Sequence, residues 1–336
     1  MKNIVNDYLY LKFKRDRKIQ IAGKQTLVFA SRLALSAFAS VFMLSKAQAT
    51  ENGLTHYPID VDTVANGFLP APGAGIVDIY TQWYNATAQA YTPYGPLKVD
   101  SSVFVFSPRF LYTLPTHFSL IPGFDSAPTI GLITPFLNLN INVPEYSEQG
   151  HSFGLGDVAL EMDMSFNHPQ GGFFSYAGMD VFFPTGSYRV GRTSNLGQNY
   201  RTFEPQYDFT WFPTRRLELD EAFVFDINTT NQANGYHSGV DFCNDWALNY
   251  TAFPVALPNV NFGIQGYNYT QISDDTIHGV VYNNGNRSQS FGIGPQITIN
   301  MFHHRGGIDI KYTHQFGVKN QSKGDKIWVE FGIPFA

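Results

Sequence analysis

The sequence predicts an all-β fold: a transmembrane, antiparallel, up-and-down β-barrel of about twelve strands. The clearest evidence is the last strand, where apolar side chains alternate strictly with Trp, Glu, Gly and Pro from Ile327 to Phe335. Such alternation places one face of a strand in an apolar medium and the other face in a wet one. A barrel ends on such a strand because its last strand pairs with its first and leaves no free edge.

Composition is the second observation. Charged residues are 15% of the 336 residues, against roughly 25% in a typical soluble protein. Aromatic residues reach 16%, yet the mean hydropathy is −0.16, as expected for strands with two unlike faces. Membrane helices would need about 20 consecutive apolar residues. The net charge of −5 without a basic cluster predicts no nucleic-acid partner. The lone Cys243 excludes an internal disulfide, and we expect no metal and no other cofactor.

The N-terminus has the features of an export signal, which we predict to span residues 1–49. A basic leader precedes a short apolar run from Leu33 to Leu44, and Ala47 to Ala49 form a small-x-small cleavage site. An N-terminal membrane anchor is the less favoured alternative, because Arg32 leaves too short an apolar run to span a bilayer. Residues 50–74, rich in Pro, Gly and Asn, are expected to form an extended periplasmic or plug segment ahead of the barrel.

The barrel is predicted over residues 75–336, and its first four strands are expected near 76–84, 103–112, 130–143 and 157–166. Each has an aromatic or aliphatic face opposite a polar one. In the third strand the apolar set is Leu137, Leu139 and Ile141, which we expect on the lipid side. The fourth strand has the cleanest alternation.

The next four strands are expected near 173–183, 202–211, 217–228 and 239–250. The fifth strand has aromatics on both faces, so its orientation stays open. Glu221 falls on the apolar face of the seventh strand, which predicts either a bulge or a register error there.

The last four strands are expected near 260–269, 291–301, 308–316 and 327–335. An even number of strands places both termini on one side. Long connections are expected at 85–97, 186–200 and 273–287, and short ones at 167–171, 213–216 and 303–306. This alternation fits short periplasmic turns and longer external loops, with 113–128 as an unexplained long exception. The competing fold, a secreted β-sandwich, should carry a Lys-, Thr- and Glu-rich outer face, which these strands lack.

Several short motifs, taken in order, resemble the family named for the meta-pathway of phenol degradation. They are His56-Tyr57-Pro58, Gly67-Phe68-Leu69-Pro70-Ala71-Pro72-Gly73, Gly154-Leu155-Gly156-Asp157, Pro184-Thr185-Gly186-Ser187-Tyr188, Asn195-Leu196-Gly197-Gln198-Asn199 and Tyr236-His237-Ser238-Gly239. The resemblance covers most of the chain after residue 49. It implies a pore or uptake channel in the outer membrane, in some members linked to aromatic compounds.

Ionisable residues on the polar faces of the strands are the candidate lumen lining. They are Arg109, Asp157, Glu161, Asp163, Glu204, Asp208, Glu218, Asp220, Asp226, Asp241, Asp245, Asp309, Lys311, Lys326 and Glu330. Because rings of acidic side chains disfavour anions, an open lumen of this kind would favour cations or neutral polar solutes. Alternatively, the acids pair with each other and with Arg189, Arg192 and Arg201, and pack the lumen shut. A barrel of about twelve strands is compatible with both.

The apolar and proline-rich residues Phe68, Leu69, Pro70 and Pro72 are the candidate plug, because a free tail would not need them. We predict a non-enzymatic channel in the outer membrane of a Gram-negative bacterium, for passive uptake of small solutes that include hydrophobic or aromatic compounds. The expected partners are outer-membrane lipid and lipopolysaccharide, the barrel-assembly machinery and an unidentified small solute. Two alternatives are an adhesive surface barrel and a lipid hydrolase built on His117 and Ser119, although no surrounding motif supports the hydrolase.

Overall fold

The structure is a computed structural model that describes residues 55–92, 95–144, 148–301 and 306–335. The predicted signal peptide, its cleavage site and residues 50–54 lie outside the described residues. In the described part of the chain, no helix has the length and apolar character needed to cross a membrane.

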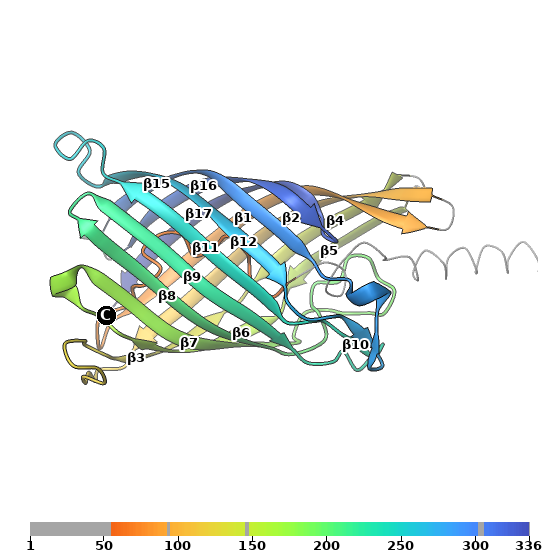
Figure 1. Cartoon of the computed structure of the whole chain (residues 1–336), viewed down its shortest axis with the longest axis horizontal. Coiled ribbons are helices and arrows are strands. Elements are labelled where there is room, and N and C mark those ends of the chain that lie inside the picture. Colours follow the sequence, from red (N-terminus) through yellow and green to blue (C-terminus); the bar gives the residue numbers. More distant parts are fainter. Residues whose placement is uncertain (1–54, 93–94, 145–147, 302–305, 336) are drawn as a thin grey trace, which may run out of the picture. The chain divides into compact units, whose positions relative to one another are not determined.

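The described strands form one large antiparallel sheet, closed on itself (Figure 1). Its members are β1 (Gly75–Thr92), β2 (Gly95–Thr113), β3 (Pro128–Ile133), β4 (Phe136–Val143), β5 (Glu148–Leu155), β6 (Val158–Ser165), β7 (Phe173–Phe183), β8 (Thr202–Thr214), β9 (Leu217–Asn228), β11 (Asp241–Tyr250), β12 (Val260–Gln271), β15 (Gln289–Met301), β16 (Gly306–Lys319) and β17 (Lys323–Phe335). A separate small sheet contains β10 (Tyr236–His237), β13 (Thr276–Ile277) and β14 (Val280–Val281). Two short 3-10 helices, η3 (Pro169–Gly171) and η4 (Asn283–Gly285), lie in connections.

Closure comes from the first and last strands, as the sequence predicts. β17 pairs with β1 from Gly75 opposite Phe335 to Thr87 opposite Lys323, and β1 pairs along its other edge with β2. β3 with β4, and β5 with β6, each occupy the place of one predicted strand, so the closed barrel has twelve strands. This confirms the predicted fold class. Closure also lets the backbone N–H and C=O groups of neighbouring strands hydrogen-bond with one another, which is necessary because lipid offers them no hydrogen-bond partners.

The fourth barrel strand is split into β5 and β6 by a bulge. Between the pairs Phe136–Leu155 and Ile133–Ala159, two residues of the third strand face three of the fourth. One extra residue reverses the side on which the following side chains lie. Asp157 therefore points into the barrel, although Leu155 points outward.

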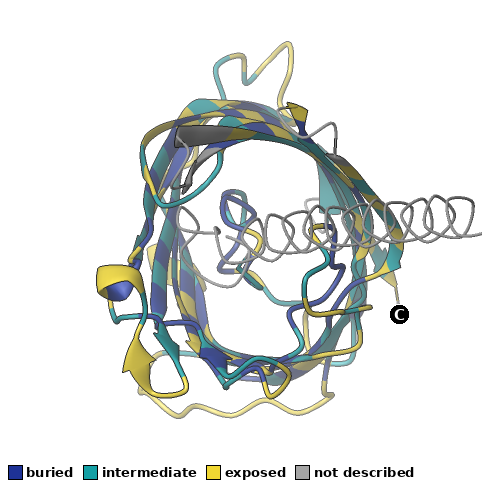
Figure 2. Cartoon of the chain, turned by 90° about the vertical axis from the view of Figure 1, so that its right-hand side faces the viewer, coloured by how far each residue is buried: buried dark blue, intermediate teal, exposed yellow. Residues whose placement is uncertain are grey.

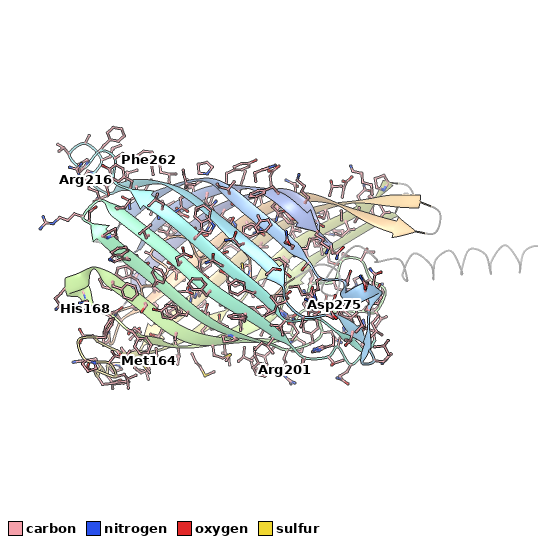
Figure 3. All side chains as sticks on the ribbon, viewed as in Figure 1. Met164, His168, Arg201, Arg216, Phe262 and Asp275 are labelled. Atoms are coloured by element: carbon pink, nitrogen blue, oxygen red, sulfur yellow. The ribbon has the colours of Figure 1, made fainter. Side chains whose placement is uncertain are left out.

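Burial alternates along the strands (Figure 2), and the buried side chains are mostly polar, whereas large apolar side chains such as Phe262 project from the outer face (Figure 3). On β9, for example, Asp220 and Val224 are buried whereas Phe225 and Ile227 are exposed. Glu221 lies on the outer face without a bulge of its own, and its carboxylate accepts a 2.7 Å hydrogen bond from Asn244. The register shift between β8 and β9 lies elsewhere, between Trp211 and Thr214.

Three expectations for the wall were wrong. The fourth strand was expected to begin near residue 157, whereas β5 already begins it at residue 148. Residues 85–97 are almost entirely strand rather than a long loop, because β1 runs to Thr92 and β2 begins at Gly95. In β4, the second half of the predicted third strand, the side chains face the opposite way from the prediction. Leu139 is buried inside the barrel, whereas Asn140 is exposed on the outside. The reason is the connection 184–201, which packs against the inner face of the β4–β5 hairpin, for example through a 3.0 Å hydrogen bond between Ser152 and Ser194.

Candidate functional site: the occupied lumen

The chain ahead of β1 runs through the barrel interior. Residues 56–67, which we call the lumen segment, begin at the end of the barrel where β7 stops and β8 starts, which we call the far end. They continue towards the opposite end, where β17 stops (Figure 1). His56 contacts Asp157 and Thr202 near the start of β8, whereas Gly67 contacts Thr210, close to the end of β8. The segment therefore follows the barrel along most of its length.

The middle of the lumen segment is fixed by two buried lysines of the wall. Lys311 Nζ donates hydrogen bonds of 2.7 Å to the carbonyl oxygen of Val61 and 2.8 Å to Thr63 Oγ1. The same ammonium group forms a 2.8 Å salt bridge with Glu330. Lys326 Nζ donates a 2.8 Å hydrogen bond to the carbonyl oxygen of Ile59. Carbonyl groups of an extended chain thus replace water around both charges.

On the opposite side of the segment, Asp245 on β11 collects backbone and hydroxyl donors. Its Oδ2 accepts from the N–H groups of Asp60 at 2.9 Å and Asp62 at 3.2 Å, and from the Tyr57 hydroxyl at 2.6 Å. The Asp60 carboxylate in turn accepts a hydrogen bond from Thr313 on β16. Charge-assisted hydrogen bonds of this type are roughly twice as strong as neutral ones, so Asp245 fixes the segment's path.

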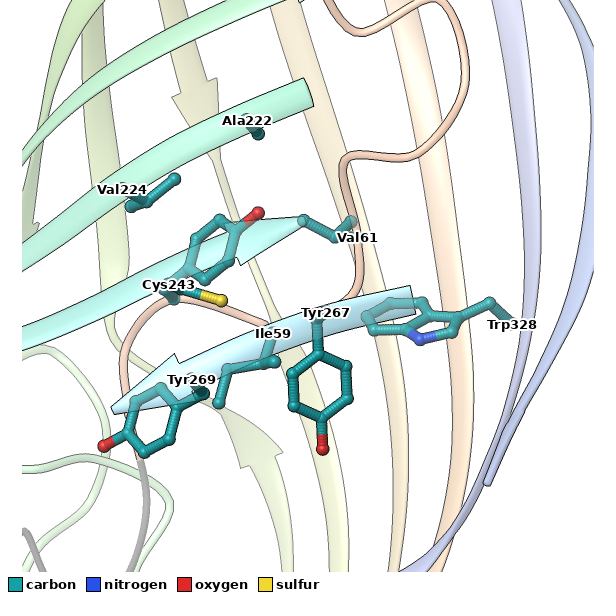
Figure 4. Packing of buried hydrophobic residues seen from close by; sticks show 9 residues of the cluster. Ile59, Val61, Ala222, Val224, Cys243, Tyr267, Tyr269 and Trp328 are labelled. Carbon is teal, nitrogen blue, oxygen red and sulfur yellow. The ribbon is translucent and has the colours of Figure 1, made fainter. Parts of the chain in front are cut away.

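A small apolar cluster covers these polar contacts (Figure 4). Its members are Tyr57, Ile59 and Val61 of the lumen segment together with Ala222, Val224, Cys243, Tyr267, Tyr269 and Trp328 of the wall. Excluding water from the polar contacts strengthens them.

The end of the lumen segment fits closely against the wall. The Ala65 N–H donates to Glu218 at 3.2 Å, and the Gly67 N–H donates to Thr210 Oγ1 at 3.0 Å. A Cβ atom on Gly67 would overlap the backbone of Phe174 and Thr210, so only glycine fits there. The Phe68 ring then stacks on Phe174 with 4.1 Å between centroids.

The start of the lumen segment meets the bulge in the wall. Asp157 Oδ2 accepts a 2.7 Å hydrogen bond from the Gln198 N–H and lies 2.9 Å from His56 Nε2, while Oδ1 accepts a 2.8 Å bond from the Gly186 N–H. The His56 ring is also stacked on Phe182. One buried carboxylate thus joins the wall, the connection 184–201 and the lumen segment. These contacts bring together four of the motifs that resemble the phenol-degradation family.

The predicted lumen residues all have inward positions, and most are buried. Those exposed by 6% or less are Asp157, Glu161, Asp163, Glu204, Asp208, Glu218, Asp220, Asp226, Asp241, Asp245, Asp309, Lys311 and Lys326. The other two, Arg109 and Glu330, are partly buried, and Arg109 pairs with Glu161 at 2.7 Å. In the described part of the chain, no salt bridge links these acids to Arg189, Arg192 or Arg201.

The lumen has more acids than bases, and some carboxylates lack partners. Neither carboxylate oxygen of Asp163 has a hydrogen-bond partner among the described residues. Sequence reasoning also missed the buried Asp180 on β7, because that strand has aromatics on both faces. It missed Asp60 and His56 as well, since an extended segment has no period that assigns its side chains to a face.

Two sets of sequence candidates lie outside this network. The apolar and proline-rich residues of the plug candidate follow the lumen segment at the end of the barrel where β17 stops. They are Phe68, Leu69, Pro70 and Pro72, and Phe68 is 40% exposed. His117 and Ser119 lie on the exposed connection between β2 and β3. The Ser119 hydroxyl donates to the carbonyl oxygen of Ile121 at 2.9 Å, not to His117. Within the described residues, no group of three or more His, Cys, Asp or Glu side chains is placed to hold a metal ion.

Comparison with solved structures identifies other barrels. The COG4313 outer membrane channel from Pseudomonas putida F1 has a TM-score of 0.65 at 18% identity, over 82% of this chain and 100% of that chain. The translocator domain of the autotransporter NalP from Neisseria meningitidis gives 0.39 at 10% identity, over 81% and 92%. The CymD monoaromatic hydrocarbon channel gives 0.38 at 6% identity, over 79% and 89%. The first of these shows a shared fold. No curated protein matches the sequence.

A closed antiparallel barrel with an apolar outer face is the strand architecture that spans the outer membrane of Gram-negative bacteria, and it places this chain there. The family model described as "Putative MetA-pathway of phenol degradation" matches residues 84–331, which is well over half of the chain. The chain therefore belongs to that family.

Proposed function

We propose that this protein is a channel for passive uptake of small solutes across the outer membrane, and that the lumen segment closes it at rest. The observation that supports this most directly is the way the segment is held. Its main contacts are hydrogen bonds that Lys311 and Lys326 donate to its carbonyl groups and that its N–H groups donate to Asp245, with only a small apolar cluster beside them. Such contacts can be exchanged for water, so the segment can leave without unfolding the wall.

The barrel's C-terminal end is proposed to face the periplasm, with the connection 184–201 on the outside. The chain reaches β1 at that end, which agrees with insertion from the periplasm by the barrel-assembly machinery. The family description points to aromatic compounds as one class of solute. The excess of lumen acids favours cations and neutral molecules over anions once the segment has moved.

A cross-link between the lumen segment and the wall tests this proposal. Ile59 and Cys243 belong to the same buried cluster, so Ile59→Cys places a second thiol beside the single native one. Oxidation should lock the segment and lower both single-channel conductance and liposome swelling, and reduction should restore them. The control is Ile59→Cys combined with Cys243→Ala, whose conductance and swelling should not change with the oxidant. Equal conductance of the oxidised and reduced forms would contradict a gating role for the segment.

Deletion of residues 50–73 provides the complementary experiment. If the segment closes the lumen, the deleted barrel should conduct more and admit larger solutes than the full chain. Unchanged conductance in a barrel that still runs as a folded species on unheated gels would reject the proposal.

A further inference from the structure

The outer wall changes from apolar to polar along a sharp line at its far end. The line crosses five neighbouring strands, β17, β1, β2, β4 and β5. The pairing register aligns their outward side chains in rows. The row below the line is apolar except for Asn138, and it contains Ile327, Trp83, Phe104, Asn138 and Phe153. The two rows above it contain Asp325, Asn85, Ser102, Asn140 and His151, and then Lys323, Thr87, Asp100, Asn142 and Gln149.

The apolar side of this line is aromatic. Trp83 and Phe104 are in ring contact at 5.1 Å between centroids, and Phe106 and Phe136 at 6.4 Å one row lower. Phe153 is 70% exposed. Aromatic girdles of this kind mark the boundary between hydrocarbon and headgroups in outer-membrane barrels. Because strands of such barrels are tilted by about 35–45°, these rows run obliquely, and the two polar rows lead from the edge of the aromatic band into the region of the lipid headgroups.

Two other strands of the wall stop close to their last outward apolar side chain. β8 begins one residue before the outward Phe203, and β9 ends one residue after the outward Ile227. The sector from β17 to β5 continues instead as a paired sheet. It presents an ordered polar surface to the headgroups where β8 and β9 have already turned into loops.

The chemistry of the two rows suits sugar hydroxyls better than a bare anion. The side-chain amides of Asn140, Asn142 and Gln149 make no hydrogen bond with the described residues, so each offers both donors and an acceptor. Asp100, which pairs with Lys98 at 2.9 Å, and Asp325, which lies 2.8 Å from His314, add acceptor oxygens, while Lys323 adds a cation. These residues and the backbone between them line a cavity of about 660 Å³.

We propose that this polar face binds the sugar headgroup of lipopolysaccharide in the outer leaflet. The site is continuous with the lipid-facing band, and its hydrogen-bonding groups match a hydroxyl-rich ligand. The inference rests on the orientation given under the proposed function, with the far end outside the cell. It concerns the outer wall and does not depend on whether the lumen conducts.

The test is binding of purified rough lipopolysaccharide to detergent-solubilised protein, read as the rise in unfolding temperature with lipid concentration. Asn140→Ala, Asn142→Ala and Gln149→Ala together should weaken the apparent affinity about tenfold or more, because several hydrogen bonds are lost. The matched control, Thr270→Ala with Gln289→Ala, removes a facing polar pair at the far end of β12 and β15, and should bind like wild type.

Phosphatidylglycerol supplies a phosphate without the sugar chain, and it should stabilise the wild type and the triple variant equally. An equal response of both variants to lipopolysaccharide, or a wild-type response no larger than that to phosphatidylglycerol, would overturn the proposal. Orientation is checked separately by labelling Val190→Cys, which is 55% exposed on the connection 184–201 and outside the proposed site, in a Cys243→Ala background with an impermeant maleimide on intact cells. Labelling without lipopolysaccharide binding refutes this inference and leaves the channel proposal intact, whereas protection from the label contradicts the orientation itself.

Discussion

At the scale of single residues, each buried charge matters through the particular hydrogen bonds and ion pairs that it makes. Lys311 makes three contacts at once, to Glu330, Val61 and Thr63, and it is fully enclosed. Sequence alternation could place Lys311 inside the barrel, because its inward position follows from the period of two. It could not identify Val61 and Thr63 as its partners, because they lie in a segment without periodicity and about 250 residues away.

Lys311→Met should therefore loosen the lumen segment. Removing one member of a buried ion pair costs about 3–5 kcal/mol, because the partner's charge is left behind. We expect a lower unfolding temperature and a higher single-channel conductance. Adding Glu330→Gln should recover part of the stability but not the closed state, since the bonds to the segment stay absent. Lys323→Met, an exposed lysine on the same sheet, is the control. A Lys311→Met variant as stable and as closed as the control would contradict the assignment.

Asp157 should be nearly as sensitive, although it is a single carboxylate in a bulge. Asp157→Asn keeps the shape but loses the charge-assisted bonds from Gly186, Gln198 and His56. Hydrogen bonds to charged groups contribute about 1.5–3 kcal/mol each. We therefore expect destabilisation of a few kcal/mol, together with faster proteolysis of the connection 184–201. Asp100→Asn, whose partner Lys98 is exposed, should leave the stability nearly unchanged. Equal effects of the two substitutions would show that Asp157 does not hold the connection.

At the scale of elements, strand periodicity predicted the wall well and the interior poorly. Nine of the twelve strands were expected within four residues, since a wall between lipid and lumen enforces a strict period of two, whereas the first, second and fourth extend eight or nine residues further than expected. The errors lie where another element covers the strand. The third strand turns its leucines inward because the connection 184–201 covers them, and residues 85–97 stay paired because β1 and β2 extend beyond the apolar band. Neither contact leaves a local signal in the sequence.

The lumen segment offers the sharpest test at this scale. Gly67 passes so close to Phe174 and Thr210 that a methyl group has no room. Gly67→Ala should prevent the end of the segment from seating, because the obstacle is backbone and not a movable side chain. We expect more frequent opening in planar bilayers with little change in the stability of the wall. Ala71→Val, at an exposed position just beyond the segment, should behave like wild type. Indistinguishable opening frequencies for the two variants would contradict the close fit.

At the scale of the whole molecule, charge is distributed unevenly between the interior and the outside. The predicted lumen set holds twelve acids and three bases. Asp163 and Asp180 are buried in the wall, and Arg109 is already paired with Glu161. Fixed negative charge facing a water-filled path concentrates cations and excludes anions. The closed structure hides this property, since the lumen segment occupies the path.

Opening the barrel by deleting residues 50–73 should therefore yield a cation-selective pore. In a potassium chloride gradient, the reversal potential should have the sign of potassium permeation, and its size should fall at high salt as the charges are screened. Asp163→Asn combined with Asp208→Asn should reduce the selectivity while leaving swelling with neutral sugars unchanged, because sugars do not respond to the fixed charge. Glu221→Gln, on the outer face, is the matched control and should leave the reversal potential unchanged. An anion-selective or unselective pore would mean that the inward acids are neutralised in the open state, and the preference for cations and neutral solutes would have to be withdrawn.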